Sequence, residues 1–159
     1  MASGDDRATP RDLDASGLRI GIVSSRWNAT VVDRLIDGVQ RGLASFGLTE
    51  TDHVSVPGAF EIPIAAKHLA QSGEFDGLVV VGAVIRGETT HYELVAGECG
   101  RAIMDVQLDT GVPIGMGILT VEDSDQAMAR SEGPGEHNVG EEAAAAAIEL
   151  AHLFANRPI

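Results

Sequence analysis

The sequence predicts a single α/β domain in which helices cover both faces of a four-stranded parallel sheet. Strand-like apolar runs alternate four times with segments whose apolar residues recur at helical spacing, which is typical of parallel sheets. One run, residues 77–85, is apolar without alternation and therefore suits a central strand buried on both faces. Because crossovers between parallel strands are right-handed, few topologies remain, and we expect a flavodoxin-like three-layer sandwich.

The composition fits one globular domain and excludes several classes of partner. Of the 159 residues, 44% are apolar, so the chain can bury a core. The net charge of −13 argues against nucleic acid and anionic membranes as partners, because either requires a basic face. The longest apolar run, residues 78–85, is far shorter than the roughly 20 residues of a membrane helix. Since no signal-peptide pattern opens the chain, we expect a cytoplasmic protein.

The chain divides into an arm and one domain. Residues 1–16 are polar and aperiodic, so we expect an N-terminal arm there rather than core. Residues 17–159 contain neither an internal repeat nor a linker long enough to separate domains, and they form the single domain. Its first strand is predicted over residues 18–24, and a turn at residues 26–28 follows.

Capping residues and helical spacing define the next elements. Asn28 or Thr30 can cap a first helix, whose apolar residues recur at helical spacing until Gly47 ends it. A short second strand spans residues 53–56. Pro63 then suits the first turn of a second helix.

The second half of the chain repeats this pattern and closes the domain. The central strand over residues 77–85 leads into a long helix with an apolar stripe over residues 92–106. A fourth strand over residues 112–120 and a short helix over residues 124–130 follow. After a Glu-Gly-Pro-Gly-Glu break, a final alanine-rich helix spans about residues 140–155.

The turn after the central strand is the best candidate site. Parallel α/β sheets bind ligands outside the carboxyl ends of their strands. There, Gly-Glu-Thr-Thr leads into the first turn of a helix, whose free backbone N–H groups suit an anion. His91, two residues beyond Thr89, adds a group that exchanges protons near neutral pH. The turns that we expect to gather at this edge are residues 26–29, 57–61, 86–91 and 120–123.

Two long motifs in these turns resemble those of the lumazine synthase family. They are Val-Pro-Gly-Ala-Phe-Glu-Ile-Pro at residues 56–63 and Gly-Ala-Val-Ile-Arg-Gly-Glu-Thr-Thr-His-Tyr at residues 82–92. The resemblance covers about residues 17–155 and leaves the arm outside. Shorter matches in the same order are Arg26-Trp27-Asn28, Gly-Ile-Leu-Thr at residues 117–120, and Asp125-Gln126-Ala127 followed by Arg130.

The resemblance implies an enzyme of riboflavin biosynthesis. The family condenses 5-amino-6-(D-ribitylamino)uracil with 3,4-dihydroxy-2-butanone 4-phosphate, giving 6,7-dimethyl-8-ribityllumazine, phosphate and water, with no metal and no organic cofactor. Such a condensation depends on holding two small molecules together and on moving protons between them. Two rival functions stay open on the same scaffold: a non-catalytic protein that binds a flavin or ribityl ligand, and a shell-forming protein.

The resemblance also implies which residues handle protons and phosphate. His91 matches the catalytic proton donor and acceptor. Glu88 and Thr89 match the turn that contacts phosphate, and because Glu88 is negative, its backbone must make that contact. Arg130 matches the arginine that binds the substrate phosphate, a group that suits the guanidinium fork.

The other substrate is matched by residues in two of the turns and on the third and fourth strands. Trp27 matches an aromatic position that stacks on the pyrimidine ring. Phe60 and Glu61 match residues that face the pyrimidine and the ribityl chain, and Met116 matches a position against the bound ring. Backbone contacts are implied for Ala59, Ala83, Val84 and Ile85.

One position departs from the family pattern. Where the family commonly has Asn-Lys-Gly near the substrate, this chain has residues 138–140, Asn-Val-Gly. Val139 cannot carry charge, so this contact is lost or replaced, and His137 can compensate in part. Elsewhere, Cys99 lies on an apolar stripe and is expected to pack in the core. No metal-ligand spacing joins the remaining histidines, His53, His68 and His152.

The resemblance finally implies an oligomer. The family forms pentamers with each active site between neighbouring subunits, and in some members twelve pentamers build an icosahedral shell. The arm commonly adds to a neighbour's sheet, which we expect of residues 8–17. Leu94 and Leu108 lie off the inner stripe of their helix, which fits a second buried face. We expect a homopentamer or a sixty-subunit shell, and the break at residues 132–136 favours the pentamer.

Overall fold

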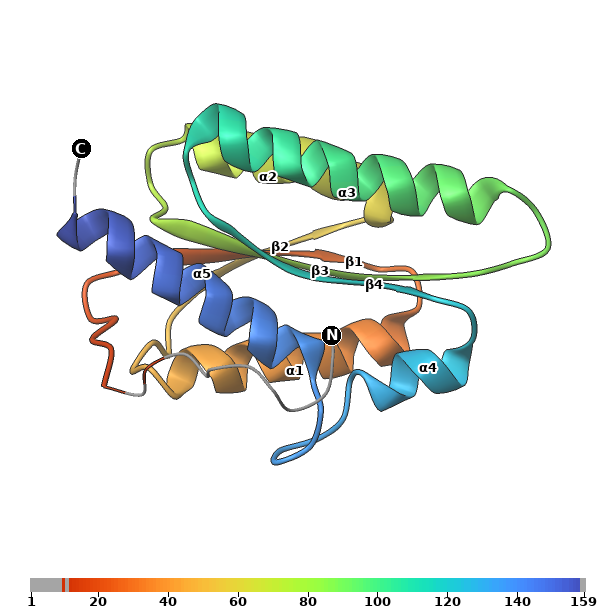
Figure 1. The fold of residues 1–159 in the computed structure, drawn as a ribbon, viewed down its shortest axis with the longest axis horizontal. Helices are drawn as coiled ribbons and strands as arrows, with labels where there is room; N and C mark the ends of the chain where they lie inside the picture. The colour runs from red at the N-terminus through yellow and green to blue at the C-terminus, as the bar shows by residue number, and fades with distance from the viewer. Residues whose placement is uncertain (1–9, 11, 158–159) are drawn as a thin grey trace.

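The protein has the predicted three layers. The computed structural model describes residue 10 and residues 12–157. In Figure 1 the sheet lies between two layers of helices, which confirms the α/β prediction. One layer holds α2 (Ile62–Gln71) and α3 (His91–Thr110), and the other holds α1 (Ala29–Ala44), α4 (Ser124–Ala129) and α5 (Val139–Asn156). No helix in the described part of the chain is long and apolar enough to cross a bilayer.

The sheet has four parallel strands in the order β2-β1-β3-β4. Their bounds are Ile20–Ser25 for β1, Asp52–Val56 for β2, Gly77–Ile85 for β3 and Ile114–Val121 for β4. β3 pairs on both sides and is buried over most of its length, as its unbroken apolar run predicts. β2 lies at an edge, and four of its five residues are exposed. Because all strands are parallel, the turns after them meet at one edge of the sheet.

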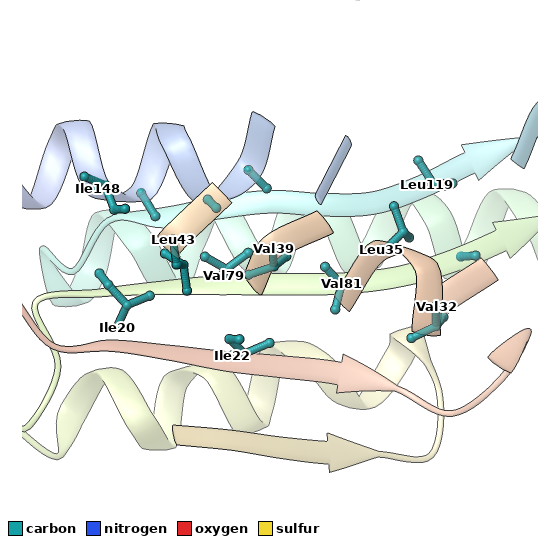
Figure 2. Close-up of a cluster of buried hydrophobic side chains, with 14 of the residues drawn as sticks. Ile20, Ile22, Val32, Leu35, Val39, Leu43, Val79, Val81, Leu119 and Ile148 are labelled. Atoms are coloured by element: carbon teal, nitrogen blue, oxygen red, sulfur yellow. The ribbon is translucent and has the colours of Figure 1, made fainter. Parts of the chain in front are cut away.

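Two apolar cores hold the layers against the sheet. On the face covered by α1 and α5, Ile22 and Val79 pack with Leu35, Val39 and Ile148, and all five are fully buried (Figure 2). Burying one such side chain contributes roughly 1.5–3 kcal/mol, so several of them together fix the position of each helix. The core on the opposite face joins α2 and α3 to the sheet through Val23, Ile62, Ala66, Leu78, Val80, Cys99 and Ile103.

Part of the predicted arm packs on the domain of the same chain. Ala15 is fully buried and Leu13 packs against the core on the α1 and α5 face. The apolar packing of the domain therefore includes residues that precede residue 17. Residues 1–9 and 11, which hold most of the predicted arm, lie outside the described residues.

The starts of two helices differ locally from the sequence predictions. Asn28 precedes α1, but its side chain forms no cap: its backbone is left-handed (φ 59°), and its amide donates to the Ala83 carbonyl at 2.8 Å. Thr30 lies inside the helix. A 3₁₀ turn, η1 (Ala59–Glu61), leads into α2 and was not predicted by any apolar pattern. α3 begins at His91, directly after the Gly-Glu-Thr-Thr turn, as predicted.

Candidate active site at the carboxyl edge of the sheet

The turns after β1 and β2 bring Trp27 and Glu61 to the two sides of one glycine. The Trp27 N–H donates to the Pro57 carbonyl at 3.3 Å, which joins the two turns. A Cβ atom placed on Gly58 would lie 3.2 Å from Cδ1 of Trp27 and 3.1 Å from Oε2 of Glu61. Any side chain at Gly58 would therefore crowd both groups, and the glycine lets an aromatic face and a carboxylate lie close together.

Two aromatic rings in these turns are left open to solvent. Trp27 is 73% exposed and Phe60 is 57% exposed. Large aromatic side chains on a turn are an unfavourable surface unless something covers them. Because both rings border the edge at which the strands end, they are available to stack on a planar ligand.

The end of β3 supplies backbone rather than side chains to this edge. The Ala83 and Ile85 side chains belong to the core under α1 and α5, whereas Val84 packs towards α2 and α3. The Ala83 carbonyl accepts the Asn28 amide, which ties the turn after β1 to β3. Ala59 is likewise buried, and its carbonyl accepts the Cys99 thiol at 3.2 Å.

The β3–α3 turn, residues 87–90, presents a run of unpaired backbone N–H groups. None of its four N–H groups donates to another described residue, and Glu88, Thr89 and His91 are all exposed. The Thr89 hydroxyl accepts the His91 N–H at 3.3 Å, while the Thr90 side chain makes no cap bond. An exposed histidine thus opens a helix directly after a turn whose N–H groups suit an anion.

Arg86 closes this turn at its base, a feature that the sequence analysis did not identify. Its guanidinium pairs with Glu93 in the first turn of α3 and with Glu122 after β4, the latter at 2.7 Å. The hydrogen bonds that Arg86 donates to Glu93 and then to Glu122 raise the pKa of its guanidinium above its usual range. In return, Arg86 lowers the pKa of the Glu93 carboxyl. The signal in the sequence was an arginine between an apolar strand and a turn, followed by acidic residues.

Arg130 and Met116 lie apart from these groups within one chain. Arg130 follows α4, on the face of the sheet opposite α3 (Figure 1), and its Nη1 donates to the Gln126 carbonyl at 3.0 Å. Met116 lies in the middle of β4, where its Cε is 3.8 Å from a Cβ placed on Gly100. Gly100 is about 14 Å along α3 from His91, given the rise of the helix. Among the described residues, neither side chain forms a hydrogen bond or ion pair with the β3–α3 turn.

The region of the family's lysine is occupied by packing and pairing. The Val139 side chain packs against the core, and its N–H donates to the Arg130 carbonyl at 2.9 Å. His137, expected to compensate, has its Nε2 3.0 Å from Oε1 of Glu142. Asn138 is 2% exposed and caps α5 by accepting the N–H groups of Gly140 and Glu141. This segment therefore positions the Arg130 backbone rather than adding a free cation.

The remaining candidate groups are structural. Cys99 is buried, as predicted, and burial raises the pKa of its thiol to about 11, so it is not a nucleophile at neutral pH. The His53 ring lies 2.7 Å from the Ser24 hydroxyl, and through the strand pairing His53 is level with Val79 of β3, well before that strand ends at Ile85. The part of the chain that the structure describes contains no group of three or more acidic, histidine or cysteine side chains arranged to hold a metal ion.

Comparison with known proteins identifies the family. The family model for 6,7-dimethyl-8-ribityllumazine synthase matches residues 17–155. Proteins with that name from Xanthomonas euvesicatoria pv. vesicatoria and Azoarcus sp. are 48% and 46% identical to this chain over 145 residues, covering 90% of it and 94% and 90% of their own lengths. One from Paraburkholderia phymatum is 47% identical over 144 residues, covering 89% of this chain and 81% of its own. With the motifs at the carboxyl edge in place, the chain belongs to the 6,7-dimethyl-8-ribityllumazine synthase family.

Proposed function

We propose that this protein is a transferase of riboflavin biosynthesis. It condenses 5-amino-6-(D-ribitylamino)uracil with 3,4-dihydroxy-2-butanone 4-phosphate to 6,7-dimethyl-8-ribityllumazine, phosphate and water, in the cytoplasm and without a cofactor. The observation that carries the proposal is an exposed histidine at the start of α3, directly after a turn of unpaired N–H groups. That arrangement serves a phosphorylated substrate whose reaction requires proton transfer.

The β3–α3 turn holds the phosphate, and His91 moves the protons. Backbone N–H groups of Glu88 and Thr89 bind the phosphate oxygens, while the Glu88 carboxylate points away from them. His91 then exchanges protons as the amine attacks the ketone, the imine forms with loss of water, phosphate leaves, and the second nitrogen closes the ring with loss of another water. Because His91 and the phosphate seat are adjacent in the chain, a single rigid helix start sets their distance.

The ribityl-substituted pyrimidine binds on the neighbouring turns. Trp27 stacks on the ring, Phe60 covers it, and the Glu61 carboxylate accepts hydrogen bonds from ribityl hydroxyls. Because Gly58 has no side chain, the Trp27 indole and the Glu61 carboxylate can lie close to one another. The ends of β2 and β3, with Ala59 and residues 83–85, supply backbone contacts.

Arg130 and Met116 complete the site of a neighbouring subunit. Both lie away from His91 in their own chain, so a ring of copies is required to bring them to a phosphate and a pyrimidine. A pentamer is the assembly that we propose, with a sixty-subunit shell as its extension. The exposed apolar side chains of α2 and α3, which include Ile64, Leu94, Met104 and Leu108, are available as the contact surface.

Product formation tests the proposal directly. Purified protein is mixed with both substrates, and the fluorescent lumazine is followed against the uncatalysed mixture. We expect a rate well above that background, and a His68→Ala variant, altered at an exposed histidine of α2, should keep it. If product forms no faster than in buffer while a ribityl ligand still binds, the protein is a binding protein and the proposal fails.

A further inference from the structure

The two residues that flank the β3–α3 turn and His91 touch one another. The Cζ atom of Arg86 lies over the ring of Tyr92, 4.2 Å from its centroid. A guanidinium over an aromatic face is a favourable arrangement. Residues 87–91 carry both the unpaired N–H groups and the histidine. The contact between Arg86 and Tyr92 therefore joins the two ends of this segment.

Arg86 also joins this contact to α3 and to the end of β4. Its own N–H donates to the Val121 carbonyl at 2.9 Å, which extends the β3–β4 ladder by one bond. Its guanidinium pairs with Glu93 on α3, and its Nε lies 2.7 Å from Oε2 of Glu122 after β4. A lysine cannot reproduce this, because only the planar fork offers donors in two directions while its face rests on a ring.

The turn has little else to define its shape. None of the N–H groups of residues 87–90 bonds to another described residue. The turn accepts two bonds from α3 within the described chain: the His91 N–H donates to the Thr89 hydroxyl and the Leu94 N–H to the Thr90 carbonyl, both at 3.3 Å. In Figure 1 the turn extends beyond the sheet at the end where the strands finish. Its position relative to α3 therefore depends on what holds its two ends.

Arg86 is not itself a free cation for the phosphate. Its single positive charge is matched by two carboxylates: Glu93 accepts from Nη1 and Glu122 accepts from Nε. All three side chains are at least one-third exposed, and exposed ion pairs contribute little to global stability. The cluster therefore connects the end of β3 to α3 and to the end of β4, but its side chains are too exposed to contribute much to global stability.

We propose that Arg86 is a positioning residue that sets the geometry of the phosphate turn and of His91, through its contacts with Tyr92, Glu93 and Glu122. This inference rests on the proposed function of the same site. A misplacement of about 1 Å can lower a rate roughly 100-fold, so releasing the base of the turn should reduce turnover and phosphate affinity together. The pyrimidine is held by other turns, and its binding should be spared.

The test compares Arg86→Met with a matched control, Arg19→Met. Arg19 has the same kind of surroundings at the opposite edge of the sheet: an ion pair with Asp52 at 2.9 Å and the Phe75 ring 5.0 Å away. Arg86→Met should lower kcat by roughly tenfold or more and raise the KM for the butanone phosphate several-fold. The KM for the pyrimidine and the melting temperature should stay near wild type. Arg19→Met should leave kcat and both KM values unchanged.

Milder variants distinguish a loss of positioning from general misfolding. Arg86→Lys should be intermediate, and Glu122→Gln should reproduce part of the rise in the butanone phosphate KM with the same melting temperature. The inference is overturned if Arg86→Met leaves kcat and that KM within about twofold of wild type. It is equally overturned if both substrate KM values rise together as the melting temperature falls, because that pattern marks a general structural role.

Calorimetric titration with inorganic phosphate separates this inference from the proposed function. Wild type and Arg19→Met should bind phosphate with equal affinity, and both should bind it more tightly than Arg86→Met. If wild type forms no lumazine but this ranking holds, the proposed function fails and the positioning role stands. If wild type is active and phosphate binding is equal in all three proteins, the positioning role fails alone.

Discussion

His91 is the residue on which the proposed chemistry depends most. It is exposed at the first position of α3 and its imidazole makes no hydrogen bond to a described residue, so its ring is free to exchange protons with a substrate. General acid–base catalysis by one group contributes roughly 10²–10⁴-fold. We therefore expect His91→Ala to lower kcat within that range.

The binding constants distinguish proton transfer from simple contact. His91→Ala should leave the affinity for a substrate analogue close to wild type, measured by quenching of Trp27 fluorescence. If affinity falls by as much as kcat, His91 holds ligand and does not act as the acid and base. His68→Ala serves as the control, since His68 is exposed in the last turn of α2.

Single residues at the site were predictable from the sequence where a motif fixes them locally. His91, Thr89 and the turn between them are neighbours in the chain, so their grouping follows from the strand–turn–helix pattern. The Arg86 contact with Glu122 spans 36 residues and depends on β3 pairing with β4, which no local pattern encodes. The capping prediction for Asn28 failed because its side chain also makes a long-range contact: it donates to the carbonyl of Ala83 on β3.

At the scale of elements, Asn138 holds the start of α5. Its side chain accepts the N–H groups of Gly140 and Glu141 and donates to the carbonyls of Arg34 and Glu132, at 3.1 and 2.8 Å. Losing a cap costs about 0.5–2 kcal/mol, and each of the two donated bonds contributes about 0.5–1.5 kcal/mol. Asn138→Ala should therefore destabilise the protein by about 2–4 kcal/mol.

Urea unfolding at a fixed protomer concentration measures this change, because assembly makes stability depend on concentration. Asn156→Ala removes an exposed amide bond to the His152 carbonyl at the other end of the same helix and should cost about 0.5 kcal/mol or less. Equal losses for the two variants would contradict the role of Asn138. Asn138→Asp keeps the cap acceptor, loses the two donated bonds and should fall between the two.

The edge strand β2 predicts a pH dependence of stability. His53 on β2 bonds to the Ser24 hydroxyl, and partial desolvation lowers the pKa of its imidazole. An unfolded histidine titrates near 6.5, so below that pH the unfolded state binds a proton that the folded state accepts only at lower pH. Stability should therefore fall as pH decreases from about 6.5 towards the folded pKa.

The comparison variant for this dependence is His53→Gln, which keeps a polar group but does not titrate. Its melting temperature should change less than that of wild type between pH 7 and the acid side of the histidine range. If both proteins lose stability in parallel there, His53 is not the source of the dependence.

Element bounds followed closely from the sequence because apolar periodicity is a local property. β3 was predicted over residues 77–85, its observed span. The 3₁₀ turn η1 was missed, although it contains three of the proposed site residues, Ala59 to Glu61. Its shape depends on the Gly58 carbonyl, which accepts the Glu61 N–H at 3.1 Å, and on the packing of Ala59 against Cys99.

At the scale of the whole molecule, the proposed site is incomplete within one chain. Trp27, Glu61 and His91 lie at one edge, whereas Arg130 caps α4 in the helical layer opposite α3, and Met116 lies in the middle of β4. The chain also leaves a set of large apolar side chains exposed on one helical layer: Phe60, Ile64, Leu94, Met104 and Leu108. A ring of copies would cover this surface and supply the missing residues, because a heterologous interface joins two different patches.

Mixing two inactive variants tests whether the site is shared. His91→Ala and Arg130→Ala are each expected to be slow, the second mainly through a raised KM for the butanone phosphate. When the two are co-expressed, a subunit with an intact His91 can face a neighbour with an intact Arg130. In a ring assembled at random from equal amounts, roughly a quarter of the interfaces then combine both residues.

The expected result is activity in the co-expressed protein well above that of either variant alone, measured at low butanone phosphate. A mixture of the separately assembled variants, without exchange of subunits, should stay inactive and is the control. If His91 and Arg130 served the same site from one chain, no arrangement of the two variants would contain an intact pair. Co-expression would then give only the average of the two slow rates, and the shared site would have to be abandoned.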